Sequence, residues 1–330
     1  MRTSLILFHS GVAFLCAAGI ANASYIIEDT YDTENFFAEF DFFSDKDPTE
    51  GFVKYSTATA ANISSLAGYV NNAVYLGVDS TTVNPPQPGR KSVRVNSKKT
   101  YTHGLIIADI AHMPESTCGS WPAFWTVGSD WPANGEIDII EGVNDDTTNH
   151  MTLHTSPGCS LQSSGALSSS TLSTPDCNAG SAGEGCSLKT TNKQGYGTGF
   201  NAVGGGVYAM EWTALAIKVF FFTRNSIPAD ISSGNPNPKT WGVPVGSFSG
   251  SGCSIDSHFK NHQIIFDTTF CGAWAGQAWN DGACAALAPT CEAYVAANPQ
   301  AFAQAYWLIN SVKVYQPNMA AGKRGIQFSG

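Results

Sequence analysis

Short stretches of alternating or continuous apolar residues recur along the whole chain, and clusters of Gly, Pro, Asn and Ser separate them. Stretches of this length that are rich in Val, Ile, Phe, Tyr and Thr are typical of β-strands. At least eleven of them, with little helical periodicity between, predict an all-β sandwich. We expect strands at 51–57, 73–79, 91–96, 105–112, 123–127, 135–142, 151–155, 208–213, 216–223, 262–270 and 306–315.

Two segments depart from this strand pattern. Residues 291–305 have a helical composition, and an internal proline limits any helix there to about two turns. Residues 156–206 are rich in Ser, Gly and Thr and contain three cysteines, so we expect a disulfide-pinned excursion from the sheet. No repeat or break in composition divides the chain, which predicts one domain over 24–316 followed by a polar tail over 317–330.

The balance of charge limits the partners of the chain. Charged residues make up only 13% of it and aromatic residues 12%, which excludes a coiled coil or charge-rich disorder. The formal net charge of -9 argues against nucleic acid as a partner. A neutral substrate with many hydroxyl groups fits better, because aromatic faces, amides and hydroxyls bind it without charge.

The first 23 residues have the pattern of a secretory signal peptide. Arg2 precedes an apolar stretch, and Ala21-Asn22-Ala23 supplies a cleavage site of small residues. A membrane anchor is the alternative, but His9 and Ser10 interrupt the apolar stretch, which is too short to span a bilayer comfortably. We therefore expect cleavage after residue 23 and a secreted protein, free or associated with a cell wall, without stable membrane attachment.

Cysteine usage agrees with export. Nine cysteines occur, and Cys16 would leave with the leader. The even remainder predicts up to four disulfides without fixing their pairing, and the absence of a Cys-x-x-Cys pair argues against a metal site. Asn62-Ile63-Ser64 is the one glycosylation sequon expected in the mature chain, which would place Asn62 on the surface. The remaining cysteines are Cys118, Cys159, Cys177, Cys186, Cys253, Cys271, Cys284 and Cys291.

Three acidic residues occur within six positions of one otherwise apolar strand, Glu136-Ile-Asp138-Ile-Ile-Glu141. Successive strand side chains alternate between faces, so Glu136 and Asp138 share one face. A regular strand would turn Glu141 to the opposite face. A β-bulge at Ile139-Ile140 would insert one residue and return Glu141 to the face of the other two acids.

Carboxyl groups gathered in this way suit the hydrolysis of a glycosidic bond. Glu136 and Glu141, leaning inward, would bring their carboxyls to roughly 5–5.5 Å, the separation of retaining rather than inverting glycosidases. Because three crowded carboxyl groups do not all ionise easily, at least one of them keeps its proton to higher pH, as a general acid requires. Asp138 lies between the two glutamates and is placed to tune how they share that proton. The alternative is a strand edge that inward-pointing charges merely protect.

Aromatic residues near these acids add a second signal. Several of the eight tryptophans lie in loops flanked by Gly or Pro, as sugar-stacking platforms do, although core packing remains an alternative for each. His150 and His154 lie on an expected strand roughly 13 Å apart, so we expect hydrogen bonding rather than metal ligation. Neither a phosphate-binding loop with its helix nor a Gly-x-Ser-x-Gly elbow occurs.

At these residues the chain resembles glycoside hydrolase family 16, whose signature is an E-x-D-x-x-E strand with a bulge, here Glu136 to Glu141. The likeness is to the fungal laminarinase-like endo-1,3(4)-β-glucanases of that family. It extends from about Tyr25 to Gln316 and includes the segments 89–94, 121–125, 151–155, 200–206, 270–277 and 305–307.

The resemblance implies a β-jelly-roll sandwich with a curved substrate cleft. In that cleft Glu136 would be the nucleophile, Glu141 the acid/base and Asp138 an assisting carboxylate. The substrate would be a β-glucan polysaccharide, and no cofactor would be required. The residues implied to line the cleft are Trp125, Trp131 and Trp274 at the subsites, His154 close to the nucleophile, and Arg90 at the cleft wall.

Three functions remain open at this point. The first is a retaining endo-β-glucanase, acting as a monomer on β-1,3-glucans, mixed-linkage glucans or both. The second is a cell-wall transglycosylase that uses the same covalent intermediate, with an acceptor sugar in place of water. The third is a glucan-binding jelly roll without catalysis, which would not need three crowded acids. We expect the first.

Overall fold

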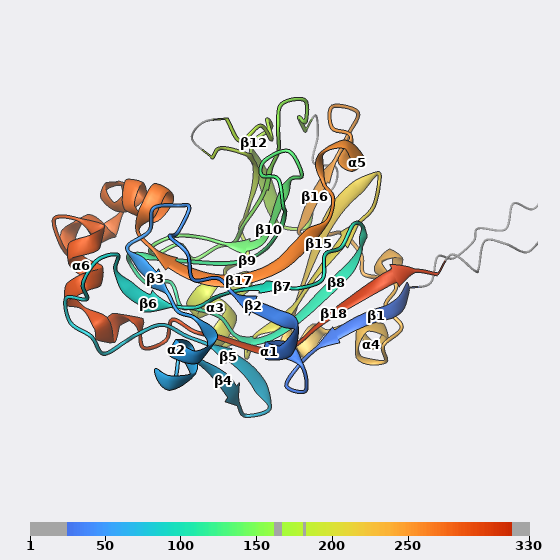
Figure 1. The fold of residues 1–330 in the computed structure, drawn as a ribbon. Helices are drawn as coiled ribbons and strands as arrows, with labels where there is room; N and C mark the ends of the chain where they lie inside the picture. Colours follow the sequence, from blue (N-terminus) through green and yellow to red (C-terminus); the bar gives the residue numbers. More distant parts are fainter. Residues whose placement is uncertain (1–24, 162–166, 181–182, 319–330) are drawn as a thin grey trace, which may run out of the picture.

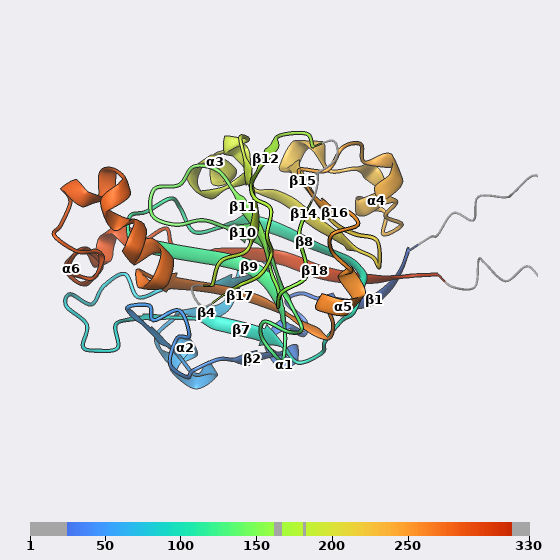
Figure 2. The same cartoon turned by 90° about the horizontal axis from the view of Figure 1, so that it is seen from above.

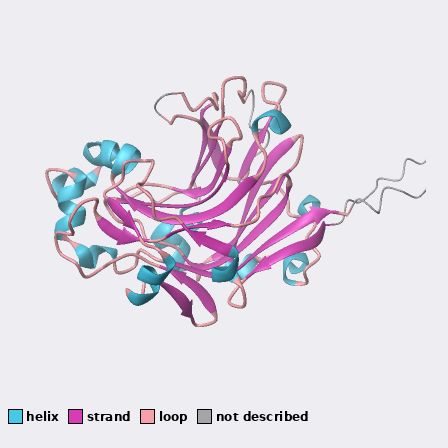
Figure 3. Cartoon of the chain, viewed as in Figure 1, coloured by secondary structure: helices cyan, strands magenta, loops and turns pink. Residues whose placement is uncertain are grey.

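The strands assemble into two large antiparallel sheets in the computed structural model, which describes residues 25–161, 167–180 and 183–318. The sheets lie one above the other, with short helices at their ends and edges (Figures 1 and 3). The expected leader over 1–23 lies outside the described residues, as do residues 319–330 of the expected tail. Within the described part of the chain, no helix is long and apolar enough to cross a membrane.

The first sheet, which we call the backing sheet, has eight strands. Its two longest strands, β8 and β18, pair with each other, and β1 also pairs with β18, so that Tyr25 lies opposite Pro317. In order, its strands are β16 (Gly246–Ser249), β15 (Ala216–Thr223), β14 (Gly206–Trp212), β8 (Gly104–His112), β18 (Trp307–Pro317), β5 (Ala73–Leu76) and β4 (Ala67–Val70), with β1 (Tyr25–Tyr31) beside β18.

The second sheet, which we call the acid-bearing sheet, also has eight strands and carries the three clustered acids. A separate parallel pair joins β3 (Val53–Tyr55) to β6 (Arg90–Ser92). In order, the strands of the acid-bearing sheet are β12 (Ser170–Thr174), β13 (Cys186–Thr190), β11 (His150–His154), β10 (Glu136–Glu141), β9 (Ser120–Gly128), β17 (His262–Phe270), β7 (Arg94–Ser97) and β2 (Phe40–Phe42).

Alternation along the strands builds the main core between the two sheets. On β17, Ile264 and Phe266 are fully buried members of this core, so Ile265 and Asp267 lie on the opposite, free face of the sheet. This two-layer arrangement confirms the expected all-β sandwich. Figure 1 shows the acid-bearing sheet curving over the backing sheet, with its free face turned away from the core.

Helices are short and occupy the margins of the sandwich. The expected helix in 291–305 is confirmed as one α-helix and one 3-10 turn, and Figure 2 shows this region at one end of the sheets. The α-helices are α1 (Phe36–Glu39), α2 (Ala58–Ile63), α3 (Gly197–Ala202), α4 (Ala229–Ser232), α5 (Ile255–His258) and α6 (Cys291–Ala297). The other helical turns are η1 (Lys193–Gly195), η2 (Arg224–Ser226), η3 (Pro238–Thr240), η4 (Gly272–Gly276), η5 (Gln277–Asp281), η6 (Ala283–Ala286) and η7 (Pro299–Phe302).

All eight cysteines expected to pair do so in four disulfides, which confirms the prediction from their even number. Two bridges fasten the helical segment that follows β17, and two fasten the region around β12 and β13. That region is less of an excursion than expected, because β12 and β13 extend the acid-bearing sheet beyond β11. The bridges are Cys118–Cys284, Cys271–Cys291, Cys159–Cys253 and Cys177–Cys186.

Candidate active site

The strand that carries the three acids contains the expected bulge. Against β9, Asp138 lies opposite Trp125 and Ile140 lies opposite Phe124, so Ile139 is an extra residue. Pairing with β11 shifts in the same interval. Both isoleucines of the bulge are fully buried, so the inserted residue returns Glu141 to the face of Asp138.

Register places each acid between two neighbours on the free face, because residues directly opposite in an antiparallel pair share a face. Glu136 lies between Val127 and His154. Asp138 lies between Trp125 and Thr152, and Glu141 lies between Ala123 and His150. The acids therefore form one line along β10, and side chains from β9 and β11 flank it.

His154 faces the first two acids from the neighbouring strand. Its Nε2 lies 3.1 Å from Asp138 Oδ2 and 4.0 Å from Glu136 Oε1, while its Nδ1 lies 3.0 Å from the carbonyl oxygen of Glu184. Burial lowers the pKa of His154, but Asp138 and Glu136 outweigh that effect and raise the pKa to about 10. His154 is therefore a cation at neutral pH, and the structure places it beside the expected nucleophile.

The two glutamates hold protons more tightly than exposed glutamates do. Burial and the charge of Asp138 raise the pKa of Glu136, while His154 and a hydrogen bond from Trp131 oppose the rise. Burial and Asp138 also raise the pKa of Glu141 well above its usual value. Asp138 is 1% exposed and Glu141 is 8% exposed, so water screens neither charge well. Such a site can keep a proton available for donation while its carboxyl groups share the negative charge.

Trp121 contacts Glu141 but was not among the expected site residues, although the segment 121–125 was part of the resemblance. Its indole nitrogen donates a hydrogen bond of 2.8 Å to Glu141 Oε1. Trp274 packs edge to face against the rings of Trp121, at 5.6 Å between centroids, and of His150, at 5.3 Å. The structure thus brings Trp274 to the Glu141 end of the line of acids. The Trp-Pro pair at the start of 121–125 was the sequence feature that could have indicated Trp121.

Trp125 lies beside Asp138 on β9, and its partners come from β17 and β7. Its indole nitrogen donates to Asp267 Oδ1 at 3.1 Å, and the guanidinium of Arg94 lies 4.8 Å from the ring centre. Neither Arg94 nor Asp267 was anticipated. The signal for Asp267 was weaker than that for the acid triplet, since it is the single acidic residue of the expected strand over 262–270.

The expectation that Arg90 lines the cleft is wrong. Its side chain is fully buried, and its guanidinium stacks 5.3 Å from the ring centre of Phe302. Within the described residues, the four hydrogen bonds from the guanidinium of Arg90 all end on main-chain carbonyls, so the side chain fastens loops together. The carbonyl oxygens belong to Asp79, Thr82, Val295 and Ala296.

Two other expected site residues lie at the surface. Trp131 is 46% exposed and precedes β10, close enough to Glu136 for the hydrogen bond described above. Asn62 is exposed on α2, as a glycan acceptor must be. Neither observation tests a role in binding or modification, so both roles stay predictions.

Among the residues that the structure describes, two groups of side chains have the donor atoms that a metal ion would need. Oxygen and nitrogen atoms of Glu136, Asp138 and His154 lie within 4.8 Å of one another. The carboxylates raise the pKa of the His154 imidazole, so a metal ion would bind this group only with loss of the imidazole proton. In the second group, Cys118 and Cys284 are bonded to each other beside Asp145, so their sulfurs are not free thiolates.

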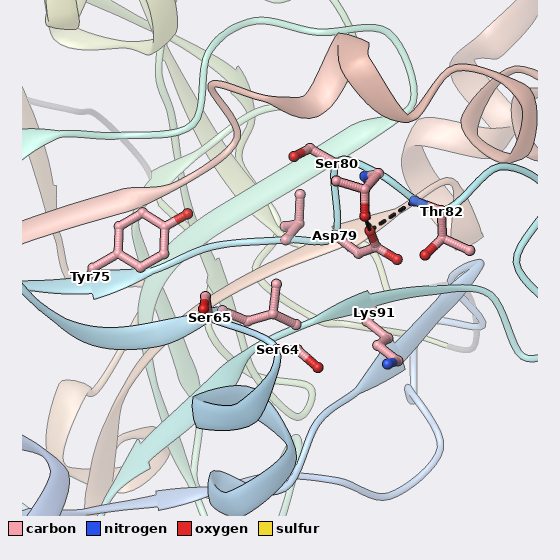
Figure 4. Close-up of a pocket in the computed structure, with 10 residues that line it drawn as sticks. Ser64, Ser65, Tyr75, Asp79, Ser80, Thr82 and Lys91 are labelled. Carbon is pink, nitrogen blue, oxygen red and sulfur yellow. Dashed lines mark hydrogen bonds between the residues drawn. The ribbon is translucent and has the colours of Figure 1, made fainter.

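A polar pocket lies elsewhere in the structure, between the turn that follows α2 and the loop that follows β5 (Figure 4). Asp79 in this pocket accepts hydrogen bonds from the backbone of Thr81 and Thr82. Burial would raise the pKa of Asp79, but these hydrogen bonds outweigh it and lower the pKa to about 2. None of the three clustered acids lines this pocket, so its chemistry is separate from theirs.

Comparison with known proteins places this geometry in a family. The family model described as "XgeA-like, catalytic GH16 domain" matches residues 40–315. The endo-1,3(4)-beta-glucanase of Arthroderma benhamiae is 47% identical over 98% of this chain and 70% of its own length. A protein of Neosartorya fischeri named probable endo-1,3(4)-beta-glucanase is 46% identical over 90% of this chain, which spans only 46% of that relative.

Solved structures agree with the sequence comparison. Laminarinase 16A from Phanerochaete chrysosporium, solved with 6-O-glucosyl-laminaritriose in donor and acceptor sites, has a TM-score of 0.84 and 42% identity. An elongating family 16 beta-1,3-glucosyltransferase has a TM-score of 0.83 and 44% identity. Each alignment covers 89% of this chain and 100% of the other. Together with the bulged acidic strand, these matches show that the chain belongs to glycoside hydrolase family 16, in its XgeA-like group.

Proposed function

We propose that the protein is a secreted, monomeric, retaining endo-β-glucanase that hydrolyses β-1,3-glucans, mixed-linkage β-1,3(1,4)-glucans or both. The observation that carries this proposal is the bulge, which gathers Glu136, Asp138 and Glu141 on one face of the sheet. Relatives named endo-1,3(4)-beta-glucanase support the substrate class. The low charge of the chain suits a neutral polysaccharide.

In the first step, the carboxylate of Glu136 attacks the anomeric carbon, and the bond from that carbon to the bridging oxygen breaks. Glu141 gives its proton to the leaving oxygen, so a glycosyl ester on Glu136 and a free chain end result. The raised pKa of Glu141 suits it to carry that proton. The cation of His154, which opposes the rise in the pKa of Glu136, favours the ionised nucleophile.

In the second step, Glu141 acts as a base. Its carboxylate takes a proton from water while the water oxygen attacks the anomeric carbon and frees Glu136. Two inversions at one carbon restore the original configuration, which is why the reaction retains it. Asp138, paired with His154, lies between the two glutamates and links their proton affinities, because its charge raises the pKa of both.

Aromatic side chains around the acids would hold the glucan. Trp125 beside Asp138, Trp274 beyond Glu141 and the half-exposed Trp131 before Glu136 are distributed along the line of acids. Sugar rings stack on indole faces through their apolar C–H groups. A long substrate that contacts several indoles is cut within the chain, which is the basis for proposing endo action.

Reducing-end release from a β-1,3-glucan and from a mixed-linkage glucan tests the proposal, with wild type and Glu136→Gln side by side. Wild-type release that is lost in the variant is expected, because an amide cannot form the glycosyl ester. Equal activity of the two proteins would refute the assignment of Glu136. Undiminished glucan binding without cleavage by wild type would instead support a non-catalytic binding protein.

A transglycosylase is the second candidate, because a solved relative at 44% identity is named an elongating glucosyltransferase. In that case a sugar hydroxyl replaces water in the second step, and the acids keep their roles. Sizing the products distinguishes the two reactions. A transglycosylase lengthens some chains and creates few new reducing ends, whereas a hydrolase shortens all chains and creates one reducing end per cut.

A further inference from the structure

A buried carboxylate next to Trp125 has no part in the proposed chemistry. Asp267 lies on the free face of β17 between Arg94 and Ala123, and it is 7% exposed. Trp125 donates to its Oδ1 at 3.1 Å, and the hydroxyl of Tyr55 donates to its Oδ2 at 2.7 Å. Each oxygen of the carboxylate therefore already accepts a hydrogen bond from another side chain.

The partners of Asp267 also fix the surroundings of the indole. The guanidinium of Arg94 lies over the ring of Trp125, 4.8 Å from its centre, and over that of Phe43, 4.4 Å from its centre. Cations bind the faces of aromatic rings, so one face of the indole is occupied. The bond to Asp267 fixes the edge of the indole that carries the N–H. Only the other face of Trp125 remains for a ligand.

A carboxylate in such a position needs a reason, because an ionised group is stable in the interior only when it is paired and hydrogen-bonded. Burial raises the pKa of Asp267 to about 6, although Arg94, Tyr55 and Trp125 all act to lower it. The side chain is thus kept at some cost in stability. Its contacts converge on one residue of the acid-bearing face, Trp125, which lies opposite Asp138.

We propose that Asp267 is a positioning residue that fixes the plane of the Trp125 indole, so that its open face is presented to a sugar ring of the glucan next to Asp138. The hydroxyl of Tyr55 donates the second hydrogen bond to the carboxylate of Asp267. Arg94 covers the face of the indole opposite the one that remains open. Asp267 acts through Trp125 and takes no part in bond breaking. This inference rests on the proposed glucanase function and on stacking of the substrate against Trp125.

Two substitutions at Asp267 test the positioning role. Asp267→Ala removes the acceptor for the indole, whereas Asp267→Asn keeps an oxygen in the same place. For a β-1,3-linked glucose hexamer, KM should rise about tenfold in the alanine variant while kcat changes less than about threefold, since stacking binds ground and transition states alike. The asparagine variant should restore most of the affinity.

The chain supplies a matched control. Asp230 accepts hydrogen bonds from the indole of Trp241 at 3.0 and 2.9 Å, but this pair lies in the cluster on the outer side of the backing sheet. Asp230→Ala should lower the melting temperature and leave KM unchanged. If Asp267→Ala does not fold, Tyr55→Phe removes one of the two donors to the carboxylate and should raise KM in the same direction.

Binding of the hexamer to Glu136→Gln, with and without Asp267→Ala, separates this inference from the proposed function. Calorimetry should show about tenfold weaker binding in the double variant, matching the rise in KM. Glucan cleavage by wild type decides the function by itself. Unchanged affinity in the Asp267→Ala background, or a fall in affinity that Asp230→Ala reproduces, overturns the positioning role.

Discussion

His154 Nε2 lies 3.1 Å from Asp138 Oδ2, so a cation on β11 faces the central carboxylate of β10. The same cation opposes the rise in the pKa of Glu136. His154→Gln should therefore raise that pKa further and move the acidic limb of the kcat/KM profile to higher pH by about one unit. A pH–rate profile on soluble β-1,3-glucan measures the shift.

His103 is the control for this variant, because its ring lies 2.7 Å from Asp256 on an unrelated pair of segments. His103→Gln should leave both limbs of the profile in place. An acidic limb that stays at its wild-type pH in His154→Gln would show that His154 does not govern the ionisation of Glu136.

Glu141 should destabilise the folded protein at neutral pH. Burial and Asp138 hold its pKa well above the usual value of 4.5, so the folded state keeps a proton that the unfolded state releases. The stability that this proton supplies is complete below about pH 4.5 and falls as the pH rises toward the folded pKa. Glu141→Gln removes this loss and should raise the free energy of unfolding at pH 7 by on the order of 1 kcal/mol or more.

Denaturant unfolding of Glu141→Gln and wild type at pH 4 and pH 7 measures that difference. The glutamine can still accept the hydrogen bond from Trp121, while activity should fall by about 10²- to 10⁴-fold with the loss of the general acid. Glu292 is exposed on α6, so Glu292→Gln should show no such pH-dependent gain. A gain that is equal at both pH values would contradict a raised pKa of Glu141.

The disulfides should differ in their contribution to stability. Cys118 and Cys284 are 166 residues apart, whereas Cys177 and Cys186 are 9 apart. A cross-link over a longer span restricts the unfolded chain more, and the chain-entropy model gives a difference of about 2–3 kcal/mol between these two. Urea unfolding of the two double-alanine variants checks the order. A larger loss of unfolding free energy in the variant without Cys177–Cys186 than in the variant without Cys118–Cys284 would contradict this prediction.

Arg90 should matter for stability and not for binding. Its guanidinium is fully buried and bonded to main-chain carbonyls from two separate segments. Arg90→Met would leave those carbonyls without a donor and should lower the free energy of unfolding by about 2–4 kcal/mol. The KM of the folded fraction should match that of wild type, as measured at a temperature well below unfolding. A raised KM would show that Arg90 contributes to substrate binding.

Periodicity predicted the parts of the fold whose strands bury one face. The expected strand over 262–270 is β17 itself, and the doubled isoleucine located the bulge in β10. The Ser- and Thr-rich strands β12 and β13 escaped notice, because their pairing with the rest of the sheet depends on tertiary contacts and not on an apolar pattern.

Sequence could not decide between Arg90 and Arg94. The two lie four positions apart, but β6 ends at Ser92 and β7 begins at Arg94, so no single strand period relates their faces. Arg90 pairs with a separate two-stranded sheet, while Arg94 lies opposite Asp267 in the acid-bearing sheet. Which arginine reaches the acids depends on that change of partner, which the local pattern does not record.

The bulge also bears on which changes in length the acidic strand tolerates. Ile139 is the residue that has no partner in β9, so a chain that lacked it would pair regularly and would keep Glu141 opposite Ala123. The acids would then share a face by simple alternation, in the pattern Glu-x-Asp-x-Glu. A strand that kept all six residues but lost the bulge would instead turn Glu141 toward the core. In genomes or in designed variants, a glutamate spacing shorter by one residue is therefore no sign of lost catalytic competence.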